Sequence, residues 1–234
     1  MWMSKDQRLS WFRPCYYNKS VIIYADSFGA YIYNKKELFP NNSYFLSLSG
    51  CDLVECCLLL SHGSLVAQQS TNDKDCLALE KGGRNFYNKM NASDFRIETF
   101  CSTCQSNCIS SFRGKIVIAS SLNGILKADR QAFQSQDIHK NINKTYEIAK
   151  RASPLASVYF VKPQKPTSPL FTDSVKQQKT FRLAIEALKK FKCIGLDELD
   201  AVTNSSHSKD GIHLSPHGTN KYWLKIKNDI ESLE

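Results

Sequence analysis

The sequence predicts an α/β fold in which helices cover both faces of a mainly parallel β-sheet. Short apolar runs, each typical of a buried strand, alternate repeatedly with longer stretches that have a helical pattern. Small or polar residues of the kinds found in enzyme sites follow several of these runs directly. This alternation favours a three-layer α/β/α domain, in which ligand sites form at the carboxyl ends of the strands.

The composition is that of one globular domain. The chain has 234 residues, of which 42% are hydrophobic and 23% are charged, which is enough for a sizeable core and short for two domains. We therefore expect a single domain over residues 1–234. Residues 61–114 are too long for one strand–helix connection, so we expect them to form an irregular, cysteine-containing insertion.

The first half of the chain contains a β-branched run that leads into a serine. Val21-Ile22-Ile23 predicts a buried strand, and Asp26-Ser27 follows it. Pro40 ends the next helical stretch, and Gly50 marks a close approach or a tight turn after the second strand. The predicted elements of this half are strands at 20–25 and 43–48 and helices at 28–38 and 52–60, with a shorter helix at 76–81 and a strand at 95–100 inside the insertion.

The second half repeats the alternation of strands and helices. Ile116-Val117-Ile118 predicts a strand that runs towards Asn123. Residues 156–161 form another apolar run, after which Pro163, Pro166 and Pro169 indicate a loop. The predicted elements are strands at 115–120, 156–161 and 192–195 and helices at 129–151, 173–191 and 219–233.

Charge and hydropathy narrow the classes of partner and compartment. The net charge is +9, but Lys and Arg are spread along the chain, so nucleic-acid binding is the less favoured interpretation. No apolar run approaches the roughly 20 residues that span a bilayer, and the N-terminus lacks the apolar core of a signal peptide. We expect an intracellular soluble protein, while a secretory route stays open if the chain belongs to a longer precursor. Glycosylation sequons, which would fit that route, occur at Asn18, Asn41, Asn91, Asn143 and Asn204.

The cysteine content leaves several interpretations open. The chain has nine cysteines, and an odd number cannot be paired completely within one chain. One cluster fits reduced thiols in a loop, a local disulfide or three metal ligands, and it consists of Cys101, Cys104 and Cys108. Reduced thiols are the favoured interpretation, because no second Cys-x-x-Cys pair follows.

Five residues at the predicted strand ends or just before the last predicted helix suit ester chemistry. The Ser27 hydroxyl is a poor nucleophile until a base takes its proton, and His213 can act as that base near neutral pH. Asp210 can fix the tautomer of the imidazole. The N–H groups of Ser27 and Gly50 and the side-chain amide of Asn123 could stabilise the oxyanion formed by attack.

The order of these segments resembles that of the SGNH (GDSL-type) hydrolases. The family has Gly-Asp-Ser after its first strand, a glycine after the second, Gly-x-Asn-Asp after the third and Asp-x-x-His before the last helix. The corresponding segments here are Ala25-Asp26-Ser27, Gly50, Ser121-Leu122-Asn123-Gly124 and Asp210-Gly211-Ile212-His213, and the last continues as Leu214-Ser215-Pro216-His217-Gly218.

The resemblance extends from about residue 20 to the C-terminus, except for 61–114. It implies a flavodoxin-like five-stranded sheet and a serine esterase that needs no cofactor or metal. Ser27, His213 and Asp210 would form the catalytic triad. Small acyl esters, for instance O-acetyl groups on carbohydrates, or lipid esters would be the substrates, and the oligomeric state stays open.

Several features keep alternatives open. Ala25 replaces the glycine of the first block, and Ser121 and Gly124 replace the glycine and the aspartate on either side of Asn123. Asn123 could instead be a turn residue, as could Asp210, while Ser27 could cap a helix and His213 could be a structural histidine. His213 and His217 also mimic a metal pair, which Pro216 between them disfavours. A second interpretation of the whole chain is a basic, catalytically weak SGNH-fold module of a viral or mobile-element protein, binding nucleic acid or carbohydrate.

Overall fold

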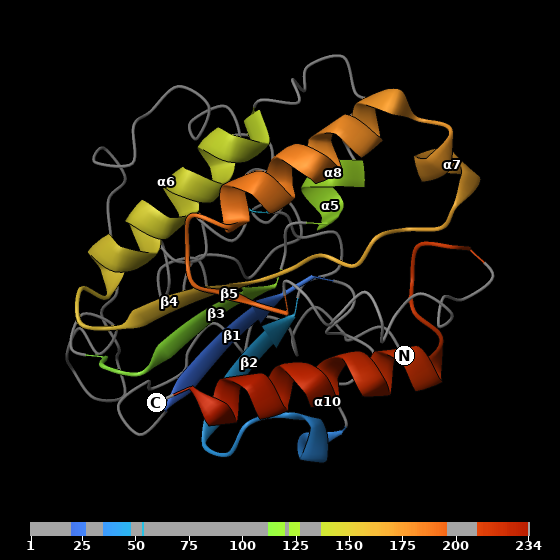
Figure 1. Cartoon of the computed structure of the whole chain (residues 1–234). Coiled ribbons are helices and arrows are strands. Elements are labelled where there is room, and N and C mark those ends of the chain that lie inside the picture. The colour runs from blue at the N-terminus through green and yellow to red at the C-terminus, as the bar shows by residue number, and fades with distance from the viewer. Residues whose placement is uncertain are drawn as a thin grey trace, which may run out of the picture.

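A five-stranded parallel sheet forms the centre of the molecule (Figure 1). The computed structural model of the chain describes residues 20–26, 35–47, 53, 112–119, 122–126, 137–195 and 210–233. The strand order is β2-β1-β3-β4-β5, which is the flavodoxin-like order, so the predicted fold class is confirmed. The strands are β1 (Val21–Ala25), β2 (Ser43–Ser47), β3 (Lys115–Ala119), β4 (Ser157–Val161) and β5 (Cys193–Ile194).

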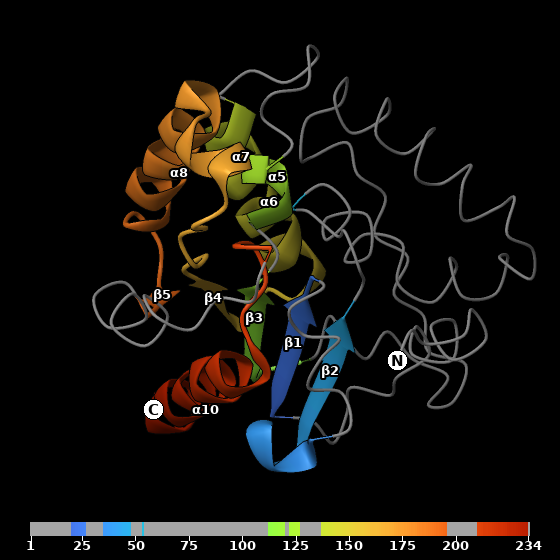
Figure 2. The same cartoon turned by 90° about the vertical axis from the view of Figure 1, so that its right-hand side faces the viewer.

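Helices cover both faces of this sheet. Helices α6 and α8 lie side by side on one face and α10 lies on the other, as the two perpendicular views show (Figures 1 and 2). This arrangement is the predicted three-layer α/β/α sandwich. The helical elements are η1 (Lys36–Leu38, a 3-10 helix), α5 (Leu122–Leu126), α6 (Asp137–Ala152), α7 (Pro169–Thr172), α8 (Val175–Leu188) and α10 (Pro216–Ser232).

The alternation of side chains along the strands produces the two cores. Every residue of β1 is buried, as expected of a central strand covered on both faces. Ile22 and Tyr24 belong to the core beneath α6 and α8, whereas Val21 and Ile23 belong to the core beneath α10. The first core also contains Ile116, Phe160, Ile142 and Leu188, and the second contains Val117, Tyr159, Trp223 and Ile226.

The strand register places the loops after the strands at one edge. Ala25 of β1 pairs with Ser47 of β2 and with Ala119 of β3, so these three strands end together. Val161 ends β4 and pairs with Ile194 of the short strand β5. Because all the strands are parallel, the carboxyl ends of β1, β3 and β4 lie at this edge, where sites of α/β proteins form.

Two helix boundaries differ from the prediction for local reasons. The last helix begins at Pro216 rather than at 219, because the Ser215 hydroxyl accepts a hydrogen bond from Gly218 N at 3.1 Å and proline fits the first turn. The helix predicted at 173–191 is preceded by a separate short helix, α7, which begins at Pro169 in the predicted loop. Ser174 then caps α8 by accepting a hydrogen bond from Gln177 N at 3.0 Å.

Several expectations lie wholly or partly outside the described residues. Only the end of the helix predicted at 28–38 is described, and it is the 3-10 helix η1. Leu53 is helical and buried, which agrees with the helix predicted at 52–60. No described helix is long and apolar enough to cross a membrane. The remaining segments outside the description include residues 129–136 and 61–111, the latter with Cys101, Cys104 and Cys108.

Candidate active site

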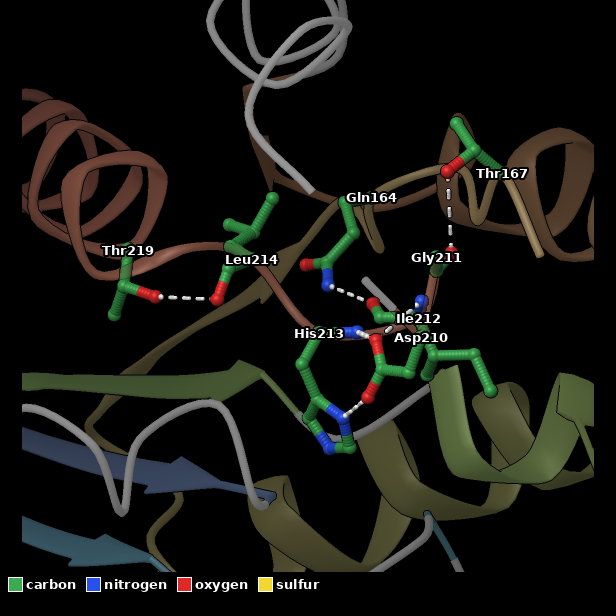
Figure 3. A network of polar contacts seen from close by, with 8 residues as sticks. All are labelled: Gln164, Thr167, Asp210, Gly211, Ile212, His213, Leu214 and Thr219. Atoms are coloured by element: carbon green, nitrogen blue, oxygen red, sulfur yellow. Dashed lines mark hydrogen bonds and ion pairs between the residues drawn. The ribbon is translucent and has the colours of Figure 1, made fainter. Parts of the chain in front are cut away.

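Asp210 and His213 form a hydrogen-bonded pair immediately before α10 (Figure 3). Asp210 Oδ2 lies 2.6 Å from His213 Nδ1. An ionised carboxylate can only accept hydrogen bonds, so the proton of this bond belongs to Nδ1, and Nε2 of the neutral ring carries a lone pair. The side chains of His213 and Asp210 are 31% and 47% exposed, so the pair is accessible to a substrate from solvent.

The second carboxylate oxygen of Asp210 shapes the turn between the two residues. Oδ1 accepts hydrogen bonds from Ile212 N and His213 N, each at 2.9 Å. Gly211 has φ +63°, in the left-handed region that favours glycine. A Cβ atom at Gly211 would lie 2.5 Å from Ser168 N, so the close approach of the two backbones also requires glycine. One carboxylate therefore closes the turn and orients the imidazole.

The loop after β4 holds this turn from its other side. Thr167 N and Ser168 N donate hydrogen bonds to the carbonyl oxygen of Gly211 at 2.7 and 3.0 Å. Gln164 Nε2 donates to the carbonyl oxygen of Ile212 at 3.2 Å. Figure 3 shows Gln164 and Thr167 approaching the turn from the side opposite to the imidazole ring. The loop after β4 thus fixes the backbone that carries the ring.

A small pocket lies where the strand order reverses between β1 and β3, at the carboxyl edge of the sheet. Asp26 and Leu122 line it, and they directly precede Ser27 and Asn123 along the chain. Gln164, which bonds the turn before α10, lines it as well. The residues before Ser27 and Asn123 and the loop that bonds the turn before α10 therefore border one pocket. Val161, Pro163 and Trp223 contribute to its apolar wall.

Two groups beneath this edge, the buried Tyr222 and the partly buried Cys193, stay neutral at physiological pH. Burial, together with the nearby charge of Asp26, raises the pKa of Tyr222 above its ordinary range, and its hydroxyl donates to the carbonyl oxygen of Lys162 at 3.3 Å. Burial also raises the pKa of Cys193 to about 12, against the opposing charge of Lys162. A thiol with this pKa is not a thiolate near neutral pH, so Cys193 is a poor nucleophile.

Comparison with known proteins gave matches among solved structures. No protein-family model matches the sequence, and no curated protein sequence matches it. A GDSL-like lipase from Bacteroides thetaiotaomicron superposes with a TM-score of 0.61 and 14% identity, covering 98% of both chains. A predicted acylhydrolase from Bacteroides fragilis superposes with a TM-score of 0.58 and 13% identity, covering 96% of this chain and 92% of the other. A member of the lipolytic G-D-S-L family from Veillonella parvula superposes with a TM-score of 0.50 and 14% identity, covering 91% of this chain and 98% of the other.

The chain has the SGNH (GDSL-type) hydrolase fold. The likeness covers nearly the whole of the chain, and at 13–14% identity it is a likeness of fold. The resemblance read from the sequence motifs is thereby confirmed for the architecture.

Within the SGNH fold, the structure describes three of the five predicted site residues. Asp210 and His213 are in contact, as their predicted roles require. Asn123 is the second residue of helix α5, so it does not lie in a turn between elements, and its side chain is half-buried. Ser27 and Gly50 lie outside the described residues, and their roles remain predictions.

Sequence reasoning did not single out Gln164 as part of this site. Its side chain is 2% exposed, and it contacts a segment far away along the chain. The available signal was its position, since it is the third residue after β4 and stands between Pro163 and Pro166 at the edge where α/β sites form. Lys162, a charged residue directly after β4, is buried.

Proposed function

We propose that the chain is a serine ester hydrolase that acts on small acyl esters. The observation that carries the proposal is the 2.6 Å bond between Asp210 Oδ2 and His213 Nδ1 at the carboxyl edge of an SGNH-type sheet. This pair leaves Nε2 of the neutral imidazole with the lone pair that a general base needs. Strand β1 ends at Ala25, two residues before Ser27, at the same edge.

In the proposed mechanism, Ser27 is the nucleophile. Its Oγ forms a bond to the ester carbonyl carbon while His213 Nε2 takes the hydroxyl proton. The Ser27 and Gly50 N–H groups and the Asn123 amide stabilise the oxyanion. His213 then gives the proton to the leaving alcohol as the C–O bond breaks, which leaves an acyl group on Ser27. Water hydrolyses this acyl-enzyme by the same proton transfers, and Asp210 stabilises the imidazolium at each stage.

Short acyl groups are the favoured substrates. The pocket at the sheet edge is small, and the exposed Lys165 follows β4 at this edge, which does not suit a long apolar acyl chain. The three solved structures described above are a GDSL-like lipase, a predicted acylhydrolase and a member of a lipolytic family, which supports ester hydrolysis as the reaction class. O-acetyl groups on carbohydrates and short-chain lipid esters are the two alcohol classes that fit.

A fluorophosphonate probe and an aryl ester test the proposal together. The wild-type protein should hydrolyse p-nitrophenyl acetate and be labelled by the probe, whereas Ser27→Ala should lose both activities and keep its circular dichroism spectrum. Ser232→Ala, which changes an exposed serine at the end of α10, should retain both. Turnover by Ser27→Ala at the wild-type rate would refute the assignment. Absent labelling combined with salt-sensitive RNA binding would favour the binding module.

A further inference from the structure

We propose that Gln164 is a positioning residue that sets the orientation of His213 through the Ile212–His213 peptide group. The inference rests on the proposed ester hydrolysis, because it names a further residue on which that reaction depends. In this arrangement Gln164 acts through the backbone. Its side-chain amide donates a hydrogen bond to the Ile212 carbonyl oxygen, 3.2 Å away, and this carbonyl belongs to the peptide group that ends at His213 N.

Both peptide groups between Gly211 and His213 are held at both of their ends. In the first, Ile212 N donates to Asp210 Oδ1 at 2.9 Å and the Gly211 carbonyl accepts from backbone N–H groups of the loop after β4. In the second, His213 N donates to the same Asp210 oxygen at 2.9 Å and the Ile212 carbonyl accepts from Gln164. A peptide group fixed at its N–H and its C=O cannot rotate about its flanking bonds without losing a hydrogen bond.

Gln164 supplies, to the carbonyl side of the Ile212–His213 peptide group, a donor that a substitution can remove. The hydrogen bonds to the Gly211 carbonyl at 2.7 and 3.0 Å come from backbone N–H groups, which every residue except proline supplies. The bond to the Ile212 carbonyl comes from a side chain that is 2% exposed. Pro163 and Pro166 are buried on either side of it and restrict the backbone there. The donor is therefore held in place before any substrate arrives.

Loss of this donor should act on the chemical step. Without it, the Ile212–His213 peptide group can turn towards other partners, which displaces His213 N from Asp210 Oδ1 and tilts the ring relative to Oδ2. A base that is displaced by about 1 Å can lose up to about 100-fold in rate. The substrate contacts do not include this peptide group in the proposed mechanism, so kcat should fall while KM changes little.

The test compares two variants that each lose one side-chain hydrogen bond to a backbone carbonyl. Gln164→Met keeps the length of the side chain but has no donor. Ser153→Ala removes the hydroxyl that donates to the Phe112 carbonyl oxygen at 3.0 Å, at the amino-terminal edge of the sheet. With p-nitrophenyl acetate, Gln164→Met should lower kcat by roughly 10- to 100-fold with KM within about two-fold. Ser153→Ala should leave kcat unchanged, even if its melting temperature falls by as much as that of Gln164→Met.

A spectroscopic measurement gives a readout that does not depend on turnover. The Nδ1 proton of His213, held against Asp210 Oδ2, should give a downfield NMR signal in the wild type that exchanges slowly with water. Gln164→Met should broaden this signal or speed its exchange, and Ser153→Ala should not. If the wild type hydrolyses no ester, the proposed function fails, and this signal still tests Gln164.

Two results would overturn the role of Gln164. One is an unchanged His213 signal, or an unchanged kcat in an active enzyme, in a folded Gln164→Met variant. The other is an equal loss of kcat in Gln164→Met and Ser153→Ala, since that would make the effect one of general stability. Should Gln164→Met fail to fold, Gln164→Glu tests the same point. The glutamate side chain is almost the same size as that of glutamine but presents acceptor oxygens to the Ile212 carbonyl, so it should show the same losses of kcat and of the His213 signal.

Discussion

Asp210 contacts His213 through both of its carboxylate oxygens. Oδ2 lies 2.6 Å from the ring nitrogen Nδ1, and Oδ1 lies 2.9 Å from the backbone nitrogen of the same residue. The carboxylate therefore restrains both the imidazole and the backbone that carries it. This double contact is possible because the Asp-x-x-His spacing closes a turn over Gly211, whose φ is +63°.

Replacement of the carboxylate by an amide tests the tautomer argument. Asp210→Asn should lower kcat by about 10³- to 10⁴-fold, because an amide side chain no longer selects the tautomer with the proton on Nδ1 or stabilises the imidazolium. Steady-state hydrolysis of p-nitrophenyl acetate measures the loss. Asp229→Asn is the matched control, since it breaks a 2.6 Å ion pair with Lys225 on α10 and should leave kcat unchanged. An Asp210→Asn variant within tenfold of the wild type would remove Asp210 from the triad.

Two glycine-to-alanine substitutions should change stability in opposite directions. Gly211→Ala forces a left-handed conformation that costs about 1–2 kcal/mol, and its Cβ would lie 2.5 Å from Ser168 N. Gly124→Ala lies within α5, and its Cβ would make an ordinary contact 3.5 Å from Ile138 Cδ1. The second variant should gain up to about 1 kcal/mol from helix propensity. Urea unfolding measures both, and an equal effect in the two would contradict the tight approach at Gly211.

The amide of Asn123 should contribute to oxyanion stabilisation. Asn123→Ala should lower kcat by about 10²- to 10³-fold with little change in KM, as expected when one oxyanion donor is lost. Asn220→Ala removes a partly buried asparagine of α10 that accepts a hydrogen bond from Lys35, and it should leave kcat unchanged. If Asn123→Ala keeps full activity, the oxyanion is held by backbone N–H groups alone.

The raised pKa of Cys193 predicts a loss of stability at alkaline pH. The folded thiol keeps its proton up to about pH 12, whereas the unfolded thiol loses it near pH 9.0. Between these values the unfolded state binds fewer protons, so the free energy of unfolding falls as the pH rises. The free energy of unfolding, measured with urea from pH 8 upward, should decline more steeply for the wild type than for Cys193→Ala. Parallel declines above pH 9 would show that burial does not protect this thiol.

The sheet was predictable because its strands carry local signals. The β-branched runs around Ile22 and Val117 identify β1 and β3 without any knowledge of their partners. Their hydrophobicity on both faces also indicates parallel strands covered by helices on each side. The Asp210–His213 contact followed from their spacing together with the resemblance of the surrounding motifs to those of a known family.

The missed features depend on contacts between distant segments or on competing local ones. Gln164 became part of the site only through its bond to Ile212, which belongs to another loop, and no sequence pattern around Gln164 signals that bond. The last helix was predicted to begin at 219, but the Ser215 hydroxyl accepts a hydrogen bond from Gly218 N and caps the helix, which therefore begins at Pro216. Lys162 is buried although its charge predicts a surface position.

The register of β1 has a consequence for the order of folding. β1 pairs residue for residue with β2 and with β3, but Val21 and Lys115 lie far apart along the chain. This fully buried strand therefore gains its second neighbour only after a long segment has been synthesised, and closing that large loop is slow. Until then the apolar edge of β1 is available to other chains, so efficient production of this protein should depend on low temperature or on chaperones that cover this strand.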